Sequence, residues 1–441
     1  MSAPPAYGSS HSRRGGLWLA WWLVVVLVLC VQSRAVSSMA LALLVDPIRA
    51  AFALSDTQFS LIQGQGFAHS IPFVLAAPLW GLAADRWSQR NLLAASMLIA
   101  GLGVVGTALA ANLWHLLFWR GVVGAGSAGF FPLALTLIAG RFDAAMQGRA
   151  LGVFYAGVGL SPGLGSLSSG ALIEQAGRVP PDALPWALQP WQLTFVWAGV
   201  LVLLCTLLVP TVRDVPHRHA APMVGSDASR ASGPVALSIG LPLLGAVFAA
   251  LSLMSLLDEA NLSWLATVYI RNHGFTPRQA GDVLGLIALV GGGVGPLAGG
   301  WLADRLFIRH GLSGRISLCL GACAASTPLL LVYLQPSAGL LTLALACSAF
   351  FLTAAVTAGV VVLQQALPAR KRGLGTGLFY SALTIVSAGG GTIVALITDR
   401  VFADPLALPR SLALVTVAMG LLASLCWLVA LWLSARRRVA T

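Results

Sequence analysis

Long apolar stretches, separated by short polar ones, constrain this chain more than any other feature. A helix needs about 20 consecutive apolar residues to cross the hydrocarbon core of a bilayer. Of the 441 residues, 58% are hydrophobic and only 9% are charged, whereas a water-soluble domain carries about 25% charged residues. We therefore predict an all-α membrane protein with twelve spans. They lie near residues 17–45, 58–81, 91–110, 113–140, 149–174, 192–211, 236–270, 277–302, 315–334, 338–366, 373–398 and 411–434.

The longest polar stretch divides these spans into two sets of six. It predicts an N-terminal bundle over residues 1–211, a linker over 212–234 and a C-terminal bundle over 235–441. Six crossings in each half place both termini on the same side. Eighteen of the 26 Lys and Arg residues fall on that side and six on the other. This bias predicts cytoplasmic termini in a bacterial inner (plasma) membrane. The first span, 17–45, is too long for a cleavable signal peptide.

An internal repeat relates the two halves. The sequence GLAADRWSQR at residues 81–90, after the second span, recurs as GWLADRLFIR at residues 300–309, after the eighth. The pair Phe154-Tyr155 in the fifth span likewise recurs as Phe379-Tyr380 in the eleventh. Because six crossings restore the direction of the chain, the repeat is parallel.

The two repeated loops resemble the signature loop of the major facilitator superfamily, Gly-x-Leu-Ala-Asp-Arg followed by a basic residue. The resemblance implies the fold of that superfamily, with twelve transmembrane helices in two six-helix halves. It also implies a latch that stabilises the outward-open state, in which the aspartate faces a helix N-terminus of the opposite half. The alternative is that these charges only end helices in water. The latch residues implied are Gly81, Asp85, Arg86, Arg90, Gly300, Asp304, Arg305 and Arg309.

Two further stretches are similar to the spinster-like and anion:cation symporter families of this superfamily. They are LSDTQ at residues 54–58 and RGVVGAG at residues 120–126, the second followed by FFP at 130–132. Those families carry an Asp-Arg pair in the first span and, in the fourth, an Arg followed seven residues later by Glu. The resemblance associates the acids with proton coupling and the arginines with anion binding.

This chain keeps both arginines, Arg34 and Arg120, but has Ser33 and Ser127 where the acids would stand. An arginine at mid-membrane costs roughly 2.5–3.5 kcal/mol on insertion scales, so it usually serves a function. An anionic substrate would supply the missing negative partner. The alternative is that the arginines pair with backbone carbonyls or with acids elsewhere.

Asp258 and Glu259 are acids deep in the seventh span, and they point roughly 100° apart on a helix. Either could carry a coupling proton or act as a counter-ion for an arginine. Other polar residues could line the same cavity or form inter-helix hydrogen bonds: Gln32, Gln63, Gln65, His69, Tyr155, Tyr380 and Gln364. We assign substrate binding to Arg34, Arg120, Ser33, Ser127, Gln32, Gln63, Tyr155 and Tyr380.

Small residues recur on two spans. Gly291, Gly295 and Gly299 share a face of the eighth, and Gly159 and Gly163 share a face of the fifth. Such faces allow close helix packing, either static or as surfaces that slide when the halves rock.

No P-loop and no metal-binding motif occurs in the sequence. We therefore expect a transporter rather than an enzyme, without cofactor, metal or nucleic-acid partner. The first hypothesis is a secondary active or facilitative carrier of a small organic anion, with protons as the candidate coupling ion. The alternatives are a spinster-like carrier of amphipathic lipids or drugs, and a membrane sensor that no longer transports. We expect a monomer in the lipid bilayer.

Overall fold

A computed structural model describes residues 10–84, 86–180, 188–212, 241–366 and 372–440 of the chain. Within these residues, twelve helices are long and apolar enough to cross a membrane, which confirms the predicted all-α membrane architecture. No strand occurs in the described residues. The predicted linker, 212–234, lies outside them apart from its first residue.

The N-terminal half supplies six spans, the fourth of which is built from two consecutive helices. The helices are α1 (Ser10–Leu43), α2 (Val45–Phe52), α3 (Asp56–Ser60), α4 (Phe67–Ala84), α5 (Gln89–Ala108), α6 (Leu113–Ser127), α7 (Phe130–Arg141), α8 (Ala144–Gly177) and α9 (Pro190–Leu208), followed by the 3-10 helix η3 (Val209–Thr211). The short helices α2 and α3 connect the first two spans.

The C-terminal half repeats this plan, with the eighth and eleventh spans interrupted. The helices are α10 (Leu241–His273), α11 (Pro277–Leu289), η4 (Val290–Val294), α12 (Gly295–His310), α13 (Leu312–Leu329), η5 (Leu330–Leu334), α14 (Ala338–Ala366), α15 (Arg372–Ser387), α16 (Gly389–Ile397), η7 (Thr398–Phe402), η8 (Pro405–Ala407) and α17 (Leu408–Ala440). Of these, η4 and η7 are π-helical.

Equivalent helix starts in the two halves use the same local chemistry. The Ser55 hydroxyl accepts a hydrogen bond from the amide of Gln58, whose side chain accepts one from the amide of Ser55. Thr276 and Gln279 form the same reciprocal cap at the start of α11. Each pair satisfies two backbone donors that the first turn leaves free.

The second span begins later than predicted. Residues 61–66 form an irregular turn between α3 and α4, whereas the sequence predicted a continuous span from residue 58 to 81. Gly64 adopts a φ of +48°, which only glycine reaches at little cost. At Gly66 a Cβ atom would lie 2.5 Å from the carbonyl oxygen of Ser60. The apolar window hid this break because glycines do not lower hydropathy as charges do.

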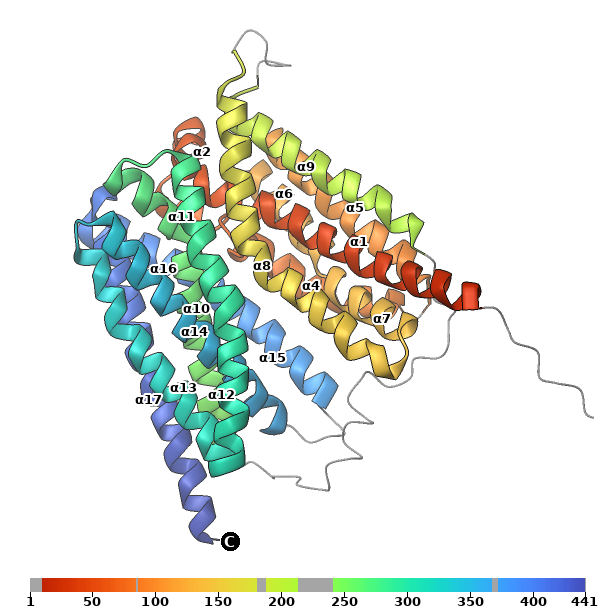
Figure 1. Ribbon diagram of the computed structural model, residues 1–441. Helices are drawn as coiled ribbons and strands as arrows, with labels where there is room; N and C mark the ends of the chain where they lie inside the picture. The colour runs from red at the N-terminus through yellow and green to blue at the C-terminus, as the bar shows by residue number, and fades with distance from the viewer. Residues whose placement is uncertain (1–9, 85, 181–187, 213–240, 367–371, 441) are drawn as a thin grey trace, which may run out of the picture.

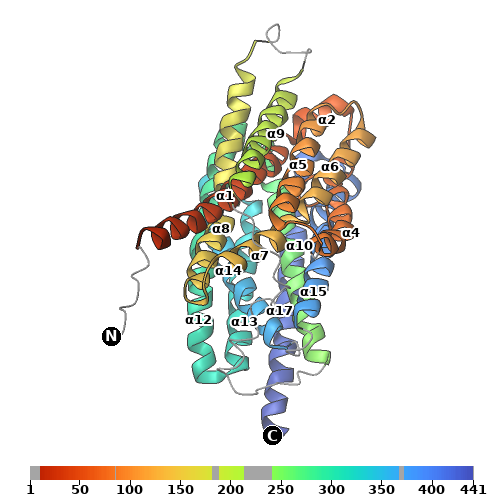
Figure 2. The same ribbon diagram turned by 90° about the vertical axis from the view of Figure 1, so that its right-hand side faces the viewer.

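The two halves meet at one end of the molecule. Figure 1 shows α8 lying against α11, with α2 at the top, whereas α7 and α12 stand apart; Figure 2 again places α2 opposite the ends of α12 and α17. We call the end with α2 and α3 the contact end, and the end with Ser10 and Ala440 the terminal end. Among the described residues, every hydrogen bond and ion pair between the halves involves residues 46–65.

Glycine backbones form the seam between α8 and the eighth span. A Cβ atom on Gly159 would lie 3.0 Å from the carbonyl oxygen of Gly292, and one on Gly163 would lie 3.0 Å from that of Gly285. The small faces predicted on the fifth and eighth spans therefore do pack closely. Gly291, Gly295 and Gly299 pack instead against α14 of their own half.

Candidate functional site

Arg120 of α6 is buried and is held by main-chain oxygens. Its Nε donates to the carbonyl of Ile62 at 3.0 Å and its Nη2 to the carbonyl of Gly64 at 2.7 Å. Pairing with backbone carbonyls was the alternative that the sequence left open for this arginine. The irregular turn at residues 61–66 can supply these carbonyls because, among the described residues, neither accepts a hydrogen bond from a backbone amide.

The same turn is also bound by the C-terminal half. Glu259 of α10 is only 5% exposed, and its Oε1 accepts hydrogen bonds from the amide of Gln65 at 3.0 Å and the hydroxyl of Ser263 at 3.2 Å. The side chain of Gln63 donates to the carbonyl of Ser263. We call residues 61–66 the clamped turn, because Arg120 of one half and Glu259 of the other both bind its backbone.

There is no room for a side chain at Gly64. A Cβ atom at this position would lie 2.5 Å from Oε1 of Glu259. The contact therefore requires glycine for two independent reasons, its positive φ and its closeness to the carboxylate.

Arg34 of α1 has a different environment. Its guanidinium lies over the ring of Phe130, 5.0 Å from the centroid. Within the described part of the chain, it forms neither a hydrogen bond nor an ion pair. Close to it in sequence, Gln32 donates to the carbonyl of Gly157 at 2.9 Å. Its Oε1 is buried and has no hydrogen-bond partner among the residues that the structure describes. Within the same described ranges, Nδ1 of His69 is likewise buried and without a hydrogen-bond partner.

The serines at the two former acid positions are both buried. The hydroxyl of Ser33 donates to the carbonyl of Cys30 at 2.9 Å, within its own helix. Ser127 ends α6, seven residues after Arg120. Neither can replace a carboxylate as a charged partner for an arginine.

The repeated Phe-Tyr pairs take equivalent positions in the two halves. Phe154 and Phe379 are buried within their own bundles, whereas Tyr155 and Tyr380 are 52% and 44% exposed. The ring centroids of each pair lie 5.6 Å and 5.7 Å apart. Each half thus leaves the tyrosine of its pair about half-exposed.

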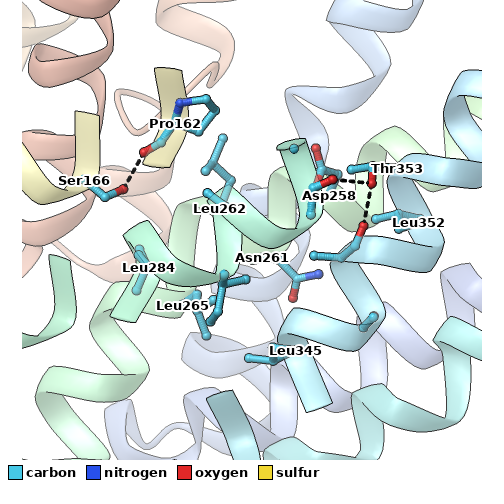
Figure 3. A pocket seen from close by; sticks show the side chains of 16 residues that line it. Pro162, Ser166, Asp258, Asn261, Leu262, Leu265, Leu284, Leu345, Leu352 and Thr353 are labelled. Carbon is cyan, nitrogen blue, oxygen red and sulfur yellow. Dashed lines mark hydrogen bonds between the residues drawn. The ribbon is translucent and has the colours of Figure 1, made fainter. Parts of the chain in front are cut away.

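Asp258 does not share the surroundings of Glu259. It is exposed to a cavity of about 190 Å³ between α8 of the N-terminal half and α10, α11, η4 and α14 of the C-terminal half (Figure 3). Among the residues that line the cavity, Asp258 is the ionisable one; six large apolar side chains are Leu262, Leu265, Leu284, Ile287, Leu345 and Leu352. Asp258 can therefore contact a ligand in the cavity, whereas Glu259 binds the backbone of the other half. Arg34 and Arg120 do not line this cavity.

A charge cluster at the contact end joins the halves and was not identified from the sequence. Nη2 of Arg271, at the end of α10, lies 2.6 Å from Oδ1 of Asp46 and 2.9 Å from Oδ1 of Asp56. Arg49 also pairs with Asp56, at 2.8 Å. The carboxylate of Asp399 in η7 accepts hydrogen bonds from the amide and hydroxyl of Thr57. The sequence held a signal for one member of this cluster, because Asp56 belongs to the LSDTQ stretch that resembles the spinster-like and anion:cation symporter families.

The predicted latch is described only in part. Asp85, the aspartate of the first copy, lies outside the described residues. Gln364, which is not a latch residue but one of the polar residues that could line the cavity, has no described side chain. Arg90 donates to Oδ1 of Asn91 at 3.2 Å, and Arg86 is exposed. In the second copy, Asp304 pairs with Arg315 of its own half at 2.8 Å, and Arg305 lies over the ring of Trp301.

Comparison with known proteins gives consistent matches along the chain. A sequence profile of the Major Facilitator Superfamily matches residues 23–325 and 247–441. An MFS-type efflux pump of Mycolicibacterium smegmatis is 25% identical over 99% of this chain and 98% of that protein. Protein spinster homolog 1 of Homo sapiens is 30% identical over 38% of this chain, and this match spans 29% of that protein.

Solved structures show the same fold. A bacterial homolog of the human lysosomal transporter spinster, in an inward-facing and unoccupied conformation, superposes with a TM-score of 0.76 at 18% identity, covering 97% of this chain and 98% of that chain. A D-xylose-proton symporter gives a TM-score of 0.65 at 16% identity, over 91% of this chain and 97% of that chain. The resemblance to the major facilitator superfamily and its spinster-like members is thus confirmed, together with the predicted fold of two six-helix halves.

Proposed function

Because the chain belongs to the Major Facilitator Superfamily, we propose that it is an alternating-access carrier of a small organic anion, and that Arg34 binds the anionic group. The observation that carries the proposal is the lack of a polar partner for Arg34 within the described residues. A guanidinium in a poorly hydrated site is costly unless an anion pairs with it. Arg120 differs, because backbone carbonyls already bind it.

The proposal also includes the orientation of the protein in the membrane and the movement of its two halves. We place both termini in the cytoplasm of a bacterium, since basic residues concentrate in the tails and loops on that side. The contact end then faces the periplasm, so the structure corresponds to an inward-facing state. Residues 1–211 and 235–441 act as the two bodies of a monomer, and they rock about the seam between α8 and the eighth span.

Closure of the terminal end would engage the latch. In the present state Asp304 is bound to Arg315 of its own half. Stabilising the outward-open state would therefore require Asp304 to exchange Arg315 for a helix N-terminus of the other half.

Replacing Arg34 with alanine tests the substrate site. We expect binding of organic anions to fall at least roughly tenfold, because a desolvated charge-assisted pair is lost. Purified protein is first screened by thermal shift against carboxylates, phosphonates and sulfonates, starting with benzoate, succinate and decanoate. Uptake of the radiolabelled best ligand is then measured in proteoliposomes.

Arg178→Ala is the matched control, since Arg178 is an exposed arginine that pairs with Glu174 on the surface of α8. Anion uptake by Arg34→Ala at the wild-type rate contradicts the assignment. Ligand binding without flux in the wild type would instead favour a sensor.

Glu259 is the coupling candidate that the geometry favours, because it bonds the backbone of the opposite half. We expect Glu259→Gln to abolish uptake driven by a pH gradient, while exchange of labelled for unlabelled substrate continues. The amide keeps the size of the side chain but cannot alternate between charged and neutral forms. Asp282→Asn, at an exposed carboxylate paired with Arg278, controls for loss of one charge. Gradient-driven uptake that survives in Glu259→Gln excludes Glu259 as the coupling group.

A second candidate function is transport of amphipathic lipids or drugs. The apolar walls of the cavity next to Asp258 favour it, since they suit a ligand with a hydrophobic body. Decyltrimethylammonium compared with tetramethylammonium, and both with succinate, separates the two candidates in the same uptake assay, because the apolar cavity carries the carboxylate of Asp258. A requirement for the long chain supports the amphipathic carrier.

A further inference from the structure

The cavity beside Asp258 combines one carboxylate with mostly aliphatic walls, so its lining discriminates between ligands by their charge. Asp258 is its ionisable residue, and most of the remaining lining is aliphatic. Within the described residues, the carboxylate of Asp258 has no hydrogen bond and no ion pair. Figure 3 shows it on the same helix as Asn261, among the side chains that line the space.

The other side-chain oxygens of the cavity already take part in hydrogen bonds, that of Ser348 with the hydroxyl of Ser326 at 2.8 Å. The hydroxyl of Ser166 donates to the carbonyl of Pro162 at 2.8 Å, and that of Thr353 donates to the carbonyl of Gly291 at 2.7 Å. Oδ1 of Asn261 accepts a hydrogen bond from the hydroxyl of Tyr333. Asp258 is therefore the strong acceptor that remains for a ligand.

These features exclude some ligands and favour another. An inorganic cation such as Ca²⁺ needs about six or more oxygen ligands, which one carboxylate and engaged hydroxyls do not supply. A carboxylate among aliphatic walls is unfavourable unless it is protonated or neutralised by a cation. A ligand with an apolar body and one positive charge would satisfy both the walls and the carboxylate.

We propose that this cavity is a binding site for a lipophilic organic cation, with Asp258 as the residue that pairs with its charge. The site goes beyond the proposed function, because it has the opposite charge preference from Arg34 and does not include that residue. Its position between α8 and the C-terminal half means that the occupant touches both bodies of the carrier. A bound cation therefore links the two halves near the seam.

Binding of benzyltrimethylammonium to the purified full-length protein in detergent, measured by calorimetry at fixed pH, tests this site. This ion carries a permanent charge, so it cannot bind by giving up a proton. We expect Asp258→Asn to weaken binding at least tenfold and Asp258→Glu to weaken it less. Asp282→Asn should bind as the wild type does. Neopentylbenzene, the neutral molecule of the same shape, should not compete for the site.

A second variant tests the cavity without changing the carboxylate. Ala288→Phe places a ring into the space and should abolish binding of benzyltrimethylammonium. Size-exclusion chromatography confirms that each variant is folded. The proposal is overturned if the folded Asp258→Asn or Ala288→Phe protein binds the cation as tightly as the wild type, or if the wild type does not bind it. Either result would leave anion uptake through Arg34 unaffected, so the two proposals fail separately.

Discussion

Loss of the Arg271 side chain is expected to open the contact end. Arg271 donates four hydrogen bonds to Asp46 and Asp56 of the other half, and Asp56 is fully buried. Removing one partner of a buried ion pair costs about 3–5 kcal/mol, because the remaining charge loses its compensation. Arg49 still contacts Asp56, so we expect the lower part of this range. A change of about 3 kcal/mol shifts a two-state equilibrium by roughly a hundredfold.

Distances between spin labels at the contact end measure this shift in Arg271→Ala. Cysteines at Ala111 and Gln335 place one label on each half, in loops at that end, after the exposed Cys347 and the half-buried Cys426 have been replaced. The distance distribution should move to longer values in the variant.

Arg278→Ala is the matched control for the Arg271 experiment. Arg278 lies at the same end of the C-terminal half, but its side chain pairs with Asp282 of its own helix. Its removal should leave the distribution unchanged. An unchanged distribution in Arg271→Ala as well would show that the ion-pair cluster does not hold this end closed.

Gly64→Ala is expected to disable transport. Alanine at a φ of +48° costs about 1–2 kcal/mol in backbone strain. Its Cβ would also lie 2.5 Å from Oε1 of Glu259, which must move and thereby loosen its bond to the amide of Gln65. We expect uptake in proteoliposomes to fall at least tenfold and the melting temperature to fall.

Substitutions at two other glycines distinguish the effect of backbone strain from that of the contact with Glu259. Gly274 also has a positive φ, +68°, but open space around a Cβ atom, whereas Gly339 has open space in a helix. Gly274→Ala therefore measures backbone strain alone, and Gly339→Ala measures neither effect. In a Glu259→Ala background, Gly64→Ala should cost less than in the wild type, because the clash is gone. Equal losses in Gly64→Ala and Gly274→Ala would count against a specific role for the clamped turn.

The sequence predicted the spans well because the bilayer imposes a length and an apolar composition on each of them. The repeat also singled out Tyr155 and Tyr380, whose side chains are 52% and 44% exposed. The clamped turn was not predicted, because two glycines inside an apolar window leave its hydropathy high. The turn appears only when the backbone path is known.

The inter-half contacts of the site could not be predicted for a different reason. Arg271 lies 215 and 225 residues from the aspartates that it binds, and nothing in the local pattern of either segment specifies the partner. Helical geometry correctly separated the directions of Asp258 and Glu259. It could not show which acid would meet a backbone amide and which a cavity, since this depends on helices of both halves.

The seam between α8 and the eighth span has a consequence for the energetics of switching. Main-chain atoms at Gly159 and Gly292 approach each other there, whereas the side chains of Leu289 and Leu167 pack against Gly163 and Gly285. A small rotation about the Gly159–Gly292 contact therefore requires repacking of few side chains. The bonds that must break are polar ones at residues 46–65, and water entering an opening mouth can replace them at a net loss of about 0.5–1.5 kcal/mol each. Exchange of protein for solvent partners therefore contributes to the balance between the two states. Exposure of apolar side chains contributes as well, because Phe59 and Ile62 of one half share a buried cluster with Trp264 of the other.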